Sequence, residues 1–256
     1  MVSQPVTYLW RLTWTGMSFF LFGLFGLLLG VCVFPILRLL PMRPNSRRIT
    51  GVRIVGLSFR CFIGFMRAAG VLTYEIRGRE RLGRPGQLII ANHPSLIDVV
   101  FLIAFTPLAG CVVKASMWRN PFTSGVALGA GYIPNFPTDM MIEGASAALE
   151  QGQTLIMFPE GTRTTPGQPL QFHRGAASVA IRAAQVLTPV YISVNPVTLT
   201  KGNPWYRIPP SRPRFSLVVG EDIDISSYRA NNLPPAAGRA LNEHLIRIFS
   251  AARSYN

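Results

Sequence analysis

The feature that most constrains this chain is an uncharged run near its amino terminus. From Leu12 to Leu37 none of the 26 residues is charged, and most are Leu, Phe or Gly. A helix with a rise of about 1.5 Å per residue would make this run roughly 39 Å long, enough to cross a hydrocarbon core of about 30 Å with tilt. A cleaved signal peptide fits less well, because the run is too long and Arg38 follows instead of a small-residue cleavage site. The sequence predicts a membrane anchor, either spanning or kinked at Pro35 to dip into one leaflet.

The residues at the two ends of the run indicate its orientation. Trp10 and Trp14 lie at one end, where aromatic side chains favour the membrane interface. Arginines crowd the other end, at positions Arg38, Arg43, Arg47 and Arg48. Because positively charged flanks stay on the cytoplasmic side, the remainder of the chain is expected in the cytoplasm.

A second apolar stretch, from Val52 to Leu72, has a different charge pattern. Arg53, Arg60 and Arg67 recur every seven residues, which places them on one stripe of a helix. The rest of the helix surface is apolar, a pattern typical of a helix that lies at the membrane interface with its arginines toward the headgroups. The alternative is an ordinary core helix with a solvated arginine face.

The distribution of charge favours a membrane over a nucleic acid as the partner. The chain carries a net charge of +14, although only 14% of its residues are charged and 49% are hydrophobic. From Arg38 to Arg84 there are eleven arginines against two glutamates, directly after the most apolar stretch. That placement suits anionic headgroups better than a recognition helix for DNA. The three widely spaced cysteines predict neither a disulfide framework nor a metal site.

Residues 74–256 alternate short apolar runs with helical patterns, which predicts an α/β domain after a membrane-binding segment at 1–73. The expected architecture is a mixed, mostly parallel sheet flanked by helices. The expected strands are Gln87 to Ala91, Gly110 to Val113, Thr154 to Phe158, Pro189 to Val194 and Phe215 to Val219. The expected helices are Leu96 to Phe105, Asn120 to Leu128, Met140 to Gln151, Gly175 to Leu187 and Ala236 to Ala252.

The stretch NHPSLID contains the first candidate catalytic residues, His93 and Asp98. It follows an expected strand and precedes an expected helix, so both side chains would lie at the carboxyl end of the strand, where α/β folds place their sites. A neutral imidazole can take a proton from a hydroxyl, and a carboxylate on its other nitrogen fixes the tautomer. A competing interpretation is that Ser95 caps the helix and Asp98 merely occupies its first turn. Ser95 lacks the G-x-S-x-G context of a nucleophile.

The second candidate stretch is LIMFPEGTR, which is again a strand followed by a charged turn. Glu160 and Arg163 could form a surface ion pair of under about 1 kcal/mol. If this strand lies parallel to the first, however, the turn lies on the same edge of the sheet as His93, and Arg163 becomes a candidate for binding phosphate.

Together these stretches resemble the N-H-x-x-x-x-D and F-P-E-G-T-R motifs of the glycerolipid acyltransferases, which include bacterial lysophosphatidic acid acyltransferases. The resemblance covers roughly residues 78–220. It implies that His93 is the general base and that Asp98 orients it, with direct attack on an acyl thioester and no acyl-enzyme. The acceptor would be bound by the remaining motif residues and by a lysine between the motifs: Asn92, Lys114, Glu160, Gly161, Thr162 and Arg163. Lys114 and Arg163 would hold the phosphate, although Lys114 could also be a solvated residue at a strand end.

Other segments of the chain refine this resemblance. Thr188-Pro189-Val190 is similar to an apolar strand motif of the family, and the segment around His173 to its basic-Gly-Ala motif. Asn135 stands where the family usually has arginine, which removes a candidate phosphate contact. The segments VVKASMWRNPF and TLTKGNPWYRIPPSRPRFSLVVG are similar to a branch found in bacterial gene clusters for aryl polyene lipids.

The resemblance implies an enzyme of the bacterial inner membrane, with its catalytic domain in the cytoplasm and no cofactor. It would acylate a lysophospholipid, in particular 1-acyl-glycerol-3-phosphate to phosphatidic acid, using acyl-ACP or acyl-CoA. The alternatives are a different lipid or polyene acceptor, or a non-catalytic scaffold that binds anionic lipid.

Overall fold

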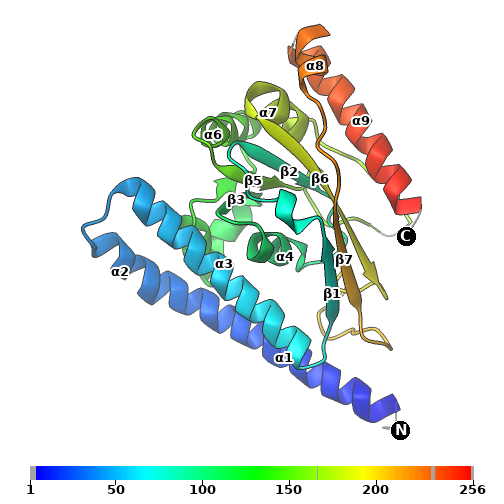
Figure 1. Ribbon diagram of the computed structural model, residues 1–256. Helices are drawn as coiled ribbons and strands as arrows, with labels where there is room; N and C mark the ends of the chain where they lie inside the picture. Colours follow the sequence, from blue (N-terminus) through cyan, green and yellow to red (C-terminus); the bar gives the residue numbers. More distant parts are fainter. Residues whose placement is uncertain (1–3, 166, 232–233, 255–256) are drawn as a thin grey trace.

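The computed structural model describes residues 4–165, 167–231 and 234–254. A central sheet is covered on both faces by helices, and a long helical hairpin lies along one side of the molecule (Figure 1). This architecture confirms the predicted class, a mostly parallel α/β sheet preceded by apolar helices.

The sheet has seven strands in the order β1-β7-β6-β2-β5-β3-β4. β6, β2, β5, β3 and β4 run parallel, whereas β7 is antiparallel to β6 and pairs in parallel with β1. The strand bounds are β1 Thr73–Arg77, β2 Gln87–Ala91, β3 Ala109–Val113, β4 Ile133–Pro134, β5 Thr154–Met157, β6 Val186–Asn195 and β7 Arg214–Val219.

Strand β2 lies at the centre of the sheet, and all five of its residues are buried. Ile89 and Ala91 face one core, while Leu88 and Ile90 face the other, as the two-residue period of a strand requires. The five predicted strands are confirmed within a few residues. β1 and β4 were not predicted, because β1 is a partly charged edge strand and β4 has two residues.

Helices cover the two faces unequally. α4, α5 and the long hairpin cover one face, and α6, α7 and α9 cover the other. The bounds are α3 Pro44–Ala68, α4 Asp98–Phe105, α5 Pro121–Gly129, α6 Thr138–Glu150, α7 Gly175–Ala183, α8 Ser226–Asn231 and α9 Pro234–Ser254, with short turns η2 Arg79–Arg81 and η3 Ala115–Arg119. The predicted helix from Gly175 was extended too far at its end, because β6 begins at Val186.

The predicted anchor forms the first arm of the hairpin. It consists of α1 Gln4–Leu28, one wide π-helical turn η1 Leu29–Val33 and α2 Phe34–Leu39. The wide turn ends two residues before Pro35, whose ring cannot fit the hydrogen bonding of a regular helix. Glycines bring this arm close to α5: a Cβ on Gly26 would lie 2.2 Å from the carbonyl oxygen of Phe122, and one on Gly30 would lie 3.1 Å from Gly125 Cα. The anchor is therefore packed along the sheet domain.

The second arm, α3, carries the arginine stripe. Its apolar side chains Val55, Phe59, Phe62, Ile63 and Met66 are buried in the core shared with β2 and α4, while Leu57 is exposed. Arg60 donates two hydrogen bonds to the carbonyl oxygen of Ala104. Both apolar arms are long enough to cross a membrane. Because they share a core with the sheet, the division at residue 73 stays a prediction.

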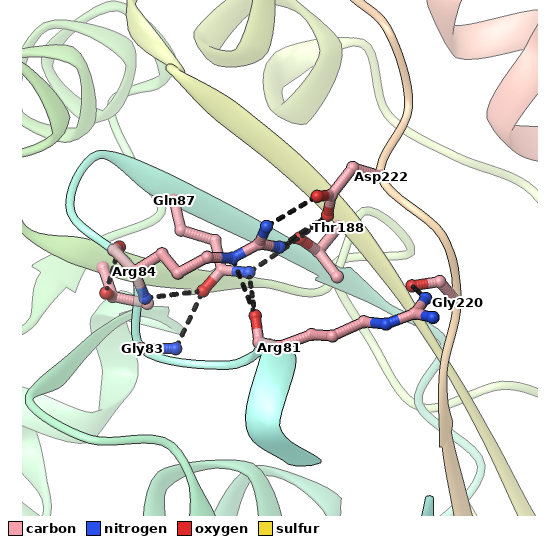
Figure 2. Close-up of polar contacts among 8 residues, drawn as sticks. Arg81, Gly83, Arg84, Gln87, Thr188, Gly220 and Asp222 are labelled. Atoms are coloured by element: carbon pink, nitrogen blue, oxygen red, sulfur yellow. Dashed lines mark hydrogen bonds and ion pairs between the residues drawn. The ribbon is translucent and has the colours of Figure 1, made fainter. Parts of the chain in front are cut away.

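A polar network closes the amino end of β2 (Figure 2). The buried side chain of Gln87 accepts hydrogen bonds from the N–H groups of Gly83 and Arg84, and it donates one of 2.7 Å to Thr188 Oγ1. Arg84 forms a two-pronged ion pair with Asp222, both contacts being 2.6 Å. This network fixes the loop before β2 to the sheet.

Candidate active site

The two motif segments meet at the carboxyl ends of β2 and β5. These strands pair in parallel, with Ile90 opposite Met157, so their following turns lie on one edge. The N–H of His93 donates a 2.9 Å hydrogen bond to Glu160 Oε1, and the N–H of Thr164 donates one of 2.7 Å to the carbonyl oxygen of His93. The expectation that the two motifs share one edge of the sheet is confirmed.

His93 and Asp98 form a direct pair. His93 Nδ1 lies 3.0 Å from Asp98 Oδ2, and the same oxygen accepts a 2.6 Å hydrogen bond from the N–H of Ser95. Asp98 is the first residue of α4, so it occupies the first helical turn and also holds the imidazole. Asp98 therefore has the position that the helix-start interpretation predicts and the contact that the histidine-orienting interpretation requires. Ser95 Oγ has no hydrogen bond and caps nothing within the described residues.

The surroundings of the pair disfavour the charged form of its carboxyl group. Burial raises the pKa of the Asp98 carboxyl, while the hydrogen bond with His93, the N–H of Ser95 and the positive charge of Arg163 oppose that rise. Burial also raises the pKa of Glu160, against hydrogen bonds from Thr164 and from the His93 N–H. Asp98 Oδ1 is buried without a hydrogen bond in the described chain. Two desolvated carboxylates therefore flank one histidine.

The His93 ring is positioned from one side and open on the other. Its ring centroid lies 4.4 Å from that of Phe158 with a 30° angle between the planes, so the phenyl group supports one face of the imidazole. The side chain is 17% exposed, and Nε2 has no hydrogen bond within the described residues. With Nδ1–H given to Asp98, Nε2 is the nitrogen available to accept a proton.

Arg163 is held by backbone rather than by a carboxylate. Its Nη1 donates to the carbonyl oxygens of Leu199 at 3.0 Å and Thr200 at 2.9 Å, in the loop after β6. The alternative of a surface ion pair with Glu160 is wrong: Glu160 is 8% exposed, and no ion pair joins the two among the described residues. Nε and Nη2 of Arg163 make no hydrogen bond within the described chain, and they remain for an anion.

The other candidate ligands lie on the same edge of the sheet and differ in their contacts. Gly161 and Thr162 are exposed in the turn, where Gly161 has φ +63° and a Cβ there would lie 3.1 Å from the His173 ring. Lys114 is exposed at the end of β3, the strand on the far side of β5 from His93. The side chain of Asn135 accepts a 3.1 Å hydrogen bond from the N–H of Ala115, so this residue closes the turn beside Lys114.

Asn92 differs from the other motif residues because both polar atoms of its side chain are bonded to the backbone of β6. Its Nδ2 donates to the carbonyl oxygen of Ile192 and its Oδ1 accepts from the N–H of Ile192, both at 2.8 Å. The amide therefore pins the end of β2 to β6. This geometry points to a structural role for Asn92, although its sequence position suggested substrate binding.

Sequence reasoning missed three contributions to the site. Thr164 bridges the motifs, Phe158 stacks on the imidazole, and the carbonyl groups of Leu199 and Thr200 hold Arg163. The first two lay within or beside the FPEGTR motif. Backbone carbonyls have no signature in sequence.

The site brings an imidazole with an unbonded nitrogen and an arginine with unbonded donors to one edge of the sheet. In the described residues no group of three or more His, Cys, Asp or Glu side chains could hold a metal. A free imidazole nitrogen near an arginine can deprotonate a hydroxyl on a substrate whose anionic group the arginine holds.

A model of the family described as "Acyltransferase" matches residues 73–194, which include His93, Asp98, Glu160 and Arg163. The chain belongs to this acyltransferase family.

Several known members are similar to this chain. It is 31% identical over 179 residues to a lyso-ornithine lipid O-acyltransferase of Pseudomonas aeruginosa, covering 68% of this chain and 66% of the relative. It is 26% identical over 168 residues to a 1-acyl-sn-glycerol-3-phosphate acyltransferase of the same organism, covering 63% of each. Over the first relatives compared, the matches span about half to two thirds of their length. The crystal structure of PlsC, the 1-acyl-sn-glycerophosphate acyltransferase of Thermotoga maritima, has the same fold, with a TM-score of 0.72, 17% identity and 98% of each chain covered.

Proposed function

We propose that the protein transfers an acyl group from a thioester to the free hydroxyl of a lysophospholipid. One observation carries the proposal: His93 is bonded to Asp98 through Nδ1, has Nε2 free, and lies on the same edge of the sheet as Arg163. The relatives named as acting on 1-acyl-sn-glycerol-3-phosphate support this acceptor class.

In this mechanism His93 Nε2 takes the proton of the acceptor hydroxyl, and the hydroxyl oxygen attacks the thioester carbonyl carbon. The carbon–sulfur bond breaks, and the imidazolium returns its proton to the departing thiolate. The products are the acylated lipid and a free thiol. Asp98 stabilises the transient imidazolium through Nδ1, and the general-base step contributes about 10²- to 10⁴-fold to the rate.

The favoured acceptor is 1-acyl-sn-glycerol-3-phosphate. Arg163 retains two unbonded donor groups, which suits paired hydrogen bonds to phosphate oxygens. Lys114 would add a second positive charge, and the exposed turn at Gly161 and Thr162 would contact the glycerol backbone. Glu160 would act indirectly, because its Oε1 holds the His93 N–H and the Thr164 hydroxyl.

A lysolipid without a phosphomonoester is the second candidate acceptor. Asn135 replaces the arginine expected from the family motif, and its side chain is already bonded to the Ala115 N–H. The relative that is 31% identical is named for a lyso-ornithine lipid. One positive charge fewer near Lys114 would favour a headgroup with less negative charge.

The donor would be acyl-ACP or acyl-CoA. Both carriers are negatively charged, and a net charge of +14 would accelerate the encounter with either.

We further propose that the hairpin lies on the cytoplasmic face of a bacterial inner membrane. The outer face of the first arm is apolar along its length, with exposed side chains Met17, Phe20, Leu24, Phe25, Leu28, Val31 and Ile36. The opposite face packs on the sheet domain, so a helix standing upright in the bilayer would carry that domain into the hydrocarbon. A helix lying flat buries only its outer face in lipid. Exposed Trp205 and Tyr206 flank this face, since Trp205 packs on Phe19.

The decisive test offers purified protein a panel of lysolipids with acyl-ACP and acyl-CoA in vesicles, and identifies the products by mass spectrometry. The proposal predicts acylated lipid and one free thiol per product. Preference for a lyso-ornithine lipid over 1-acyl-glycerol-3-phosphate would select the second acceptor. Thiol release without any acceptor would indicate a hydrolase, and no turnover with any pair would indicate a lipid-binding scaffold.

A further inference from the structure

The loop that joins β6 to β7, residues 196–213, contacts both catalytic motifs through its backbone. The carbonyl oxygen of Leu199 accepts hydrogen bonds from the N–H of Leu96 at 3.1 Å and from Arg163 Nη1 at 3.0 Å. Leu96 belongs to NHPSLID and Arg163 to FPEGTR. One carbonyl group therefore joins the two segments that build the candidate active site.

The backbone of Leu199 is held in an unusual conformation. Its φ is +55°, in the left-handed region that residues with a side chain rarely adopt. The side chain is 6% exposed. It lines a small cavity of about 20 Å³ together with Arg11, Ile97 and Pro209. Such strain persists only where the surroundings enforce it, and here it presents the carbonyl group to both motifs.

The same loop is clamped at its other end by the anchor helix. Arg11 is 7% exposed and donates hydrogen bonds to the carbonyl oxygens of Pro209 at 2.9 Å and Pro210 at 2.6 Å. Among the described residues, these two carbonyl groups are the hydrogen-bond partners of the Arg11 guanidinium. Trp205 packs nearby, where a Cβ on Gly16 would lie 3.2 Å from its ring. A buried charge must be hydrogen-bonded, so these two bonds fix the end of the loop relative to α1.

We propose that Arg11 and Leu199 are positioning residues through which the anchor helix α1 holds Arg163 in place for the headgroup of the acceptor. This inference rests on the proposed function. Arg11 secures the loop to α1, and the buried Leu199 side chain fixes the carbonyl group that engages Arg163 Nη1. Nε and Nη2 are then presented in one orientation. The packing of the anchor and the binding of the acceptor are thereby coupled.

The test measures lysolipid and thioester kinetics separately for Arg11→Met and for the control Arg182→Met, an exposed arginine of α7 on the other face of the sheet with no hydrogen bond among the described residues. Arg11→Met is expected to raise KM for the lysolipid about tenfold, with kcat and the thioester KM within about twofold of wild type. Arg11→Lys, which keeps a donor, should be affected less. Combined with Arg163→Ala, the Arg11→Met change should add nothing.

Leu199→Gly tests the same coupling if Arg11→Met does not fold. Leu199→Gly retains easy access to positive φ but removes the buried side chain, so it should also raise the lysolipid KM without adding to Arg163→Ala. Additive effects, equal rises in both KM values, or an Arg11 variant that matches Arg182→Met would overturn the inference. If Arg163→Ala itself leaves the lysolipid KM unchanged, the proposed role of Arg163 fails first.

Discussion

The two ends of strand β2 carry polar clusters of opposite character. At the amino end, Gln87 and Thr188 are fully buried, and their side chains are bonded to each other and to Arg84 or Asp222 (Figure 2). At the carboxyl end, by contrast, Ser95 Oγ and Asp98 Oδ1 are buried without a hydrogen bond in the described chain, and His93 Nε2 is free.

The two ends of the strand therefore differ in what their polar groups can do: they stabilise the fold at one end and meet a substrate at the other. A buried network whose groups are all paired stabilises the fold and has nothing left to offer a substrate. An unpaired buried oxygen costs about 1–3 kcal/mol, so the carboxyl end is less stable than it could be. That cost is reasonable where the unpaired groups serve a reaction. Substitutions at the two ends should therefore fail in different ways.

The largest effect is expected from His93→Ala. Removing the base should lower kcat by about 10²- to 10⁴-fold, because no other group in the described site replaces Nε2. The variant should fold, since the side chain is partly exposed and the backbone N–H that binds Glu160 is retained. Thiol release measured per folded protein checks this. His244→Ala, a histidine of α9 that pairs with Tyr228, is the matched control and should keep its activity.

Asp98→Asn should separate activity from stability. Burial raises the pKa of Asp98 above its ordinary value of 3.8, so its stabilising contribution is present below that value and is lost as the pH rises through the folded-state pKa. The ionised form of this desolvated carboxyl therefore costs the fold stability. The variant should lose about 10²- to 10³-fold in kcat. Its thermal midpoint at pH 7 should be no lower than that of wild type. A marked drop in the midpoint would contradict this electrostatic assignment.

Thr188→Val should show the opposite pattern. The valine removes the hydroxyl that joins Gln87, Arg84 and Asp222, leaving Gln87 Nε2 without one of its partners. Unfolding in urea should reveal a loss of about 1–3 kcal/mol. Values of kcat and KM for the folded fraction should match wild type. Reduced kcat at unchanged stability would show that the two ends are not independent.

The smallest effect is expected from Trp205→Ala combined with Tyr206→Ala. These side chains are 44% and 55% exposed beside the apolar face of α1. Losing part of this area from the lipid interface should cost about 1 kcal/mol, which is roughly a fivefold weaker association with anionic vesicles. Sedimentation with vesicles measures it. Val218→Ala, at an exposed residue of the sheet, is the control. An equal loss of vesicle association in both variants would show that the loop does not contact the membrane.

The sequence predicts those parts of the molecule that are encoded in short, continuous patterns of residues. β2 was placed at its observed bounds because its run is continuous and apolar, and the two motifs were brought to one edge because their strands are parallel. Loop 196–213 was not understood, since a proline-rich segment has no period and its contacts use carbonyl oxygens. Arg11 was passed over for the same reason: it stands at the start of an uncharged run, and nothing in the sequence pairs it with residues almost 200 positions away.

The central claim is that His93 carries its proton on Nδ1 and leaves Nε2 bare. Nitrogen-15 NMR of the histidine rings, with the His93 signals assigned by their loss in His93→Ala, measures this directly in the neutral form of the ring. The Nδ1–H tautomer is predicted in wild type, and a mixture of tautomers in Asp98→Asn. A wild-type ring that carries its proton on Nε2 would contradict the claim, because that nitrogen could not then accept the proton of a hydroxyl.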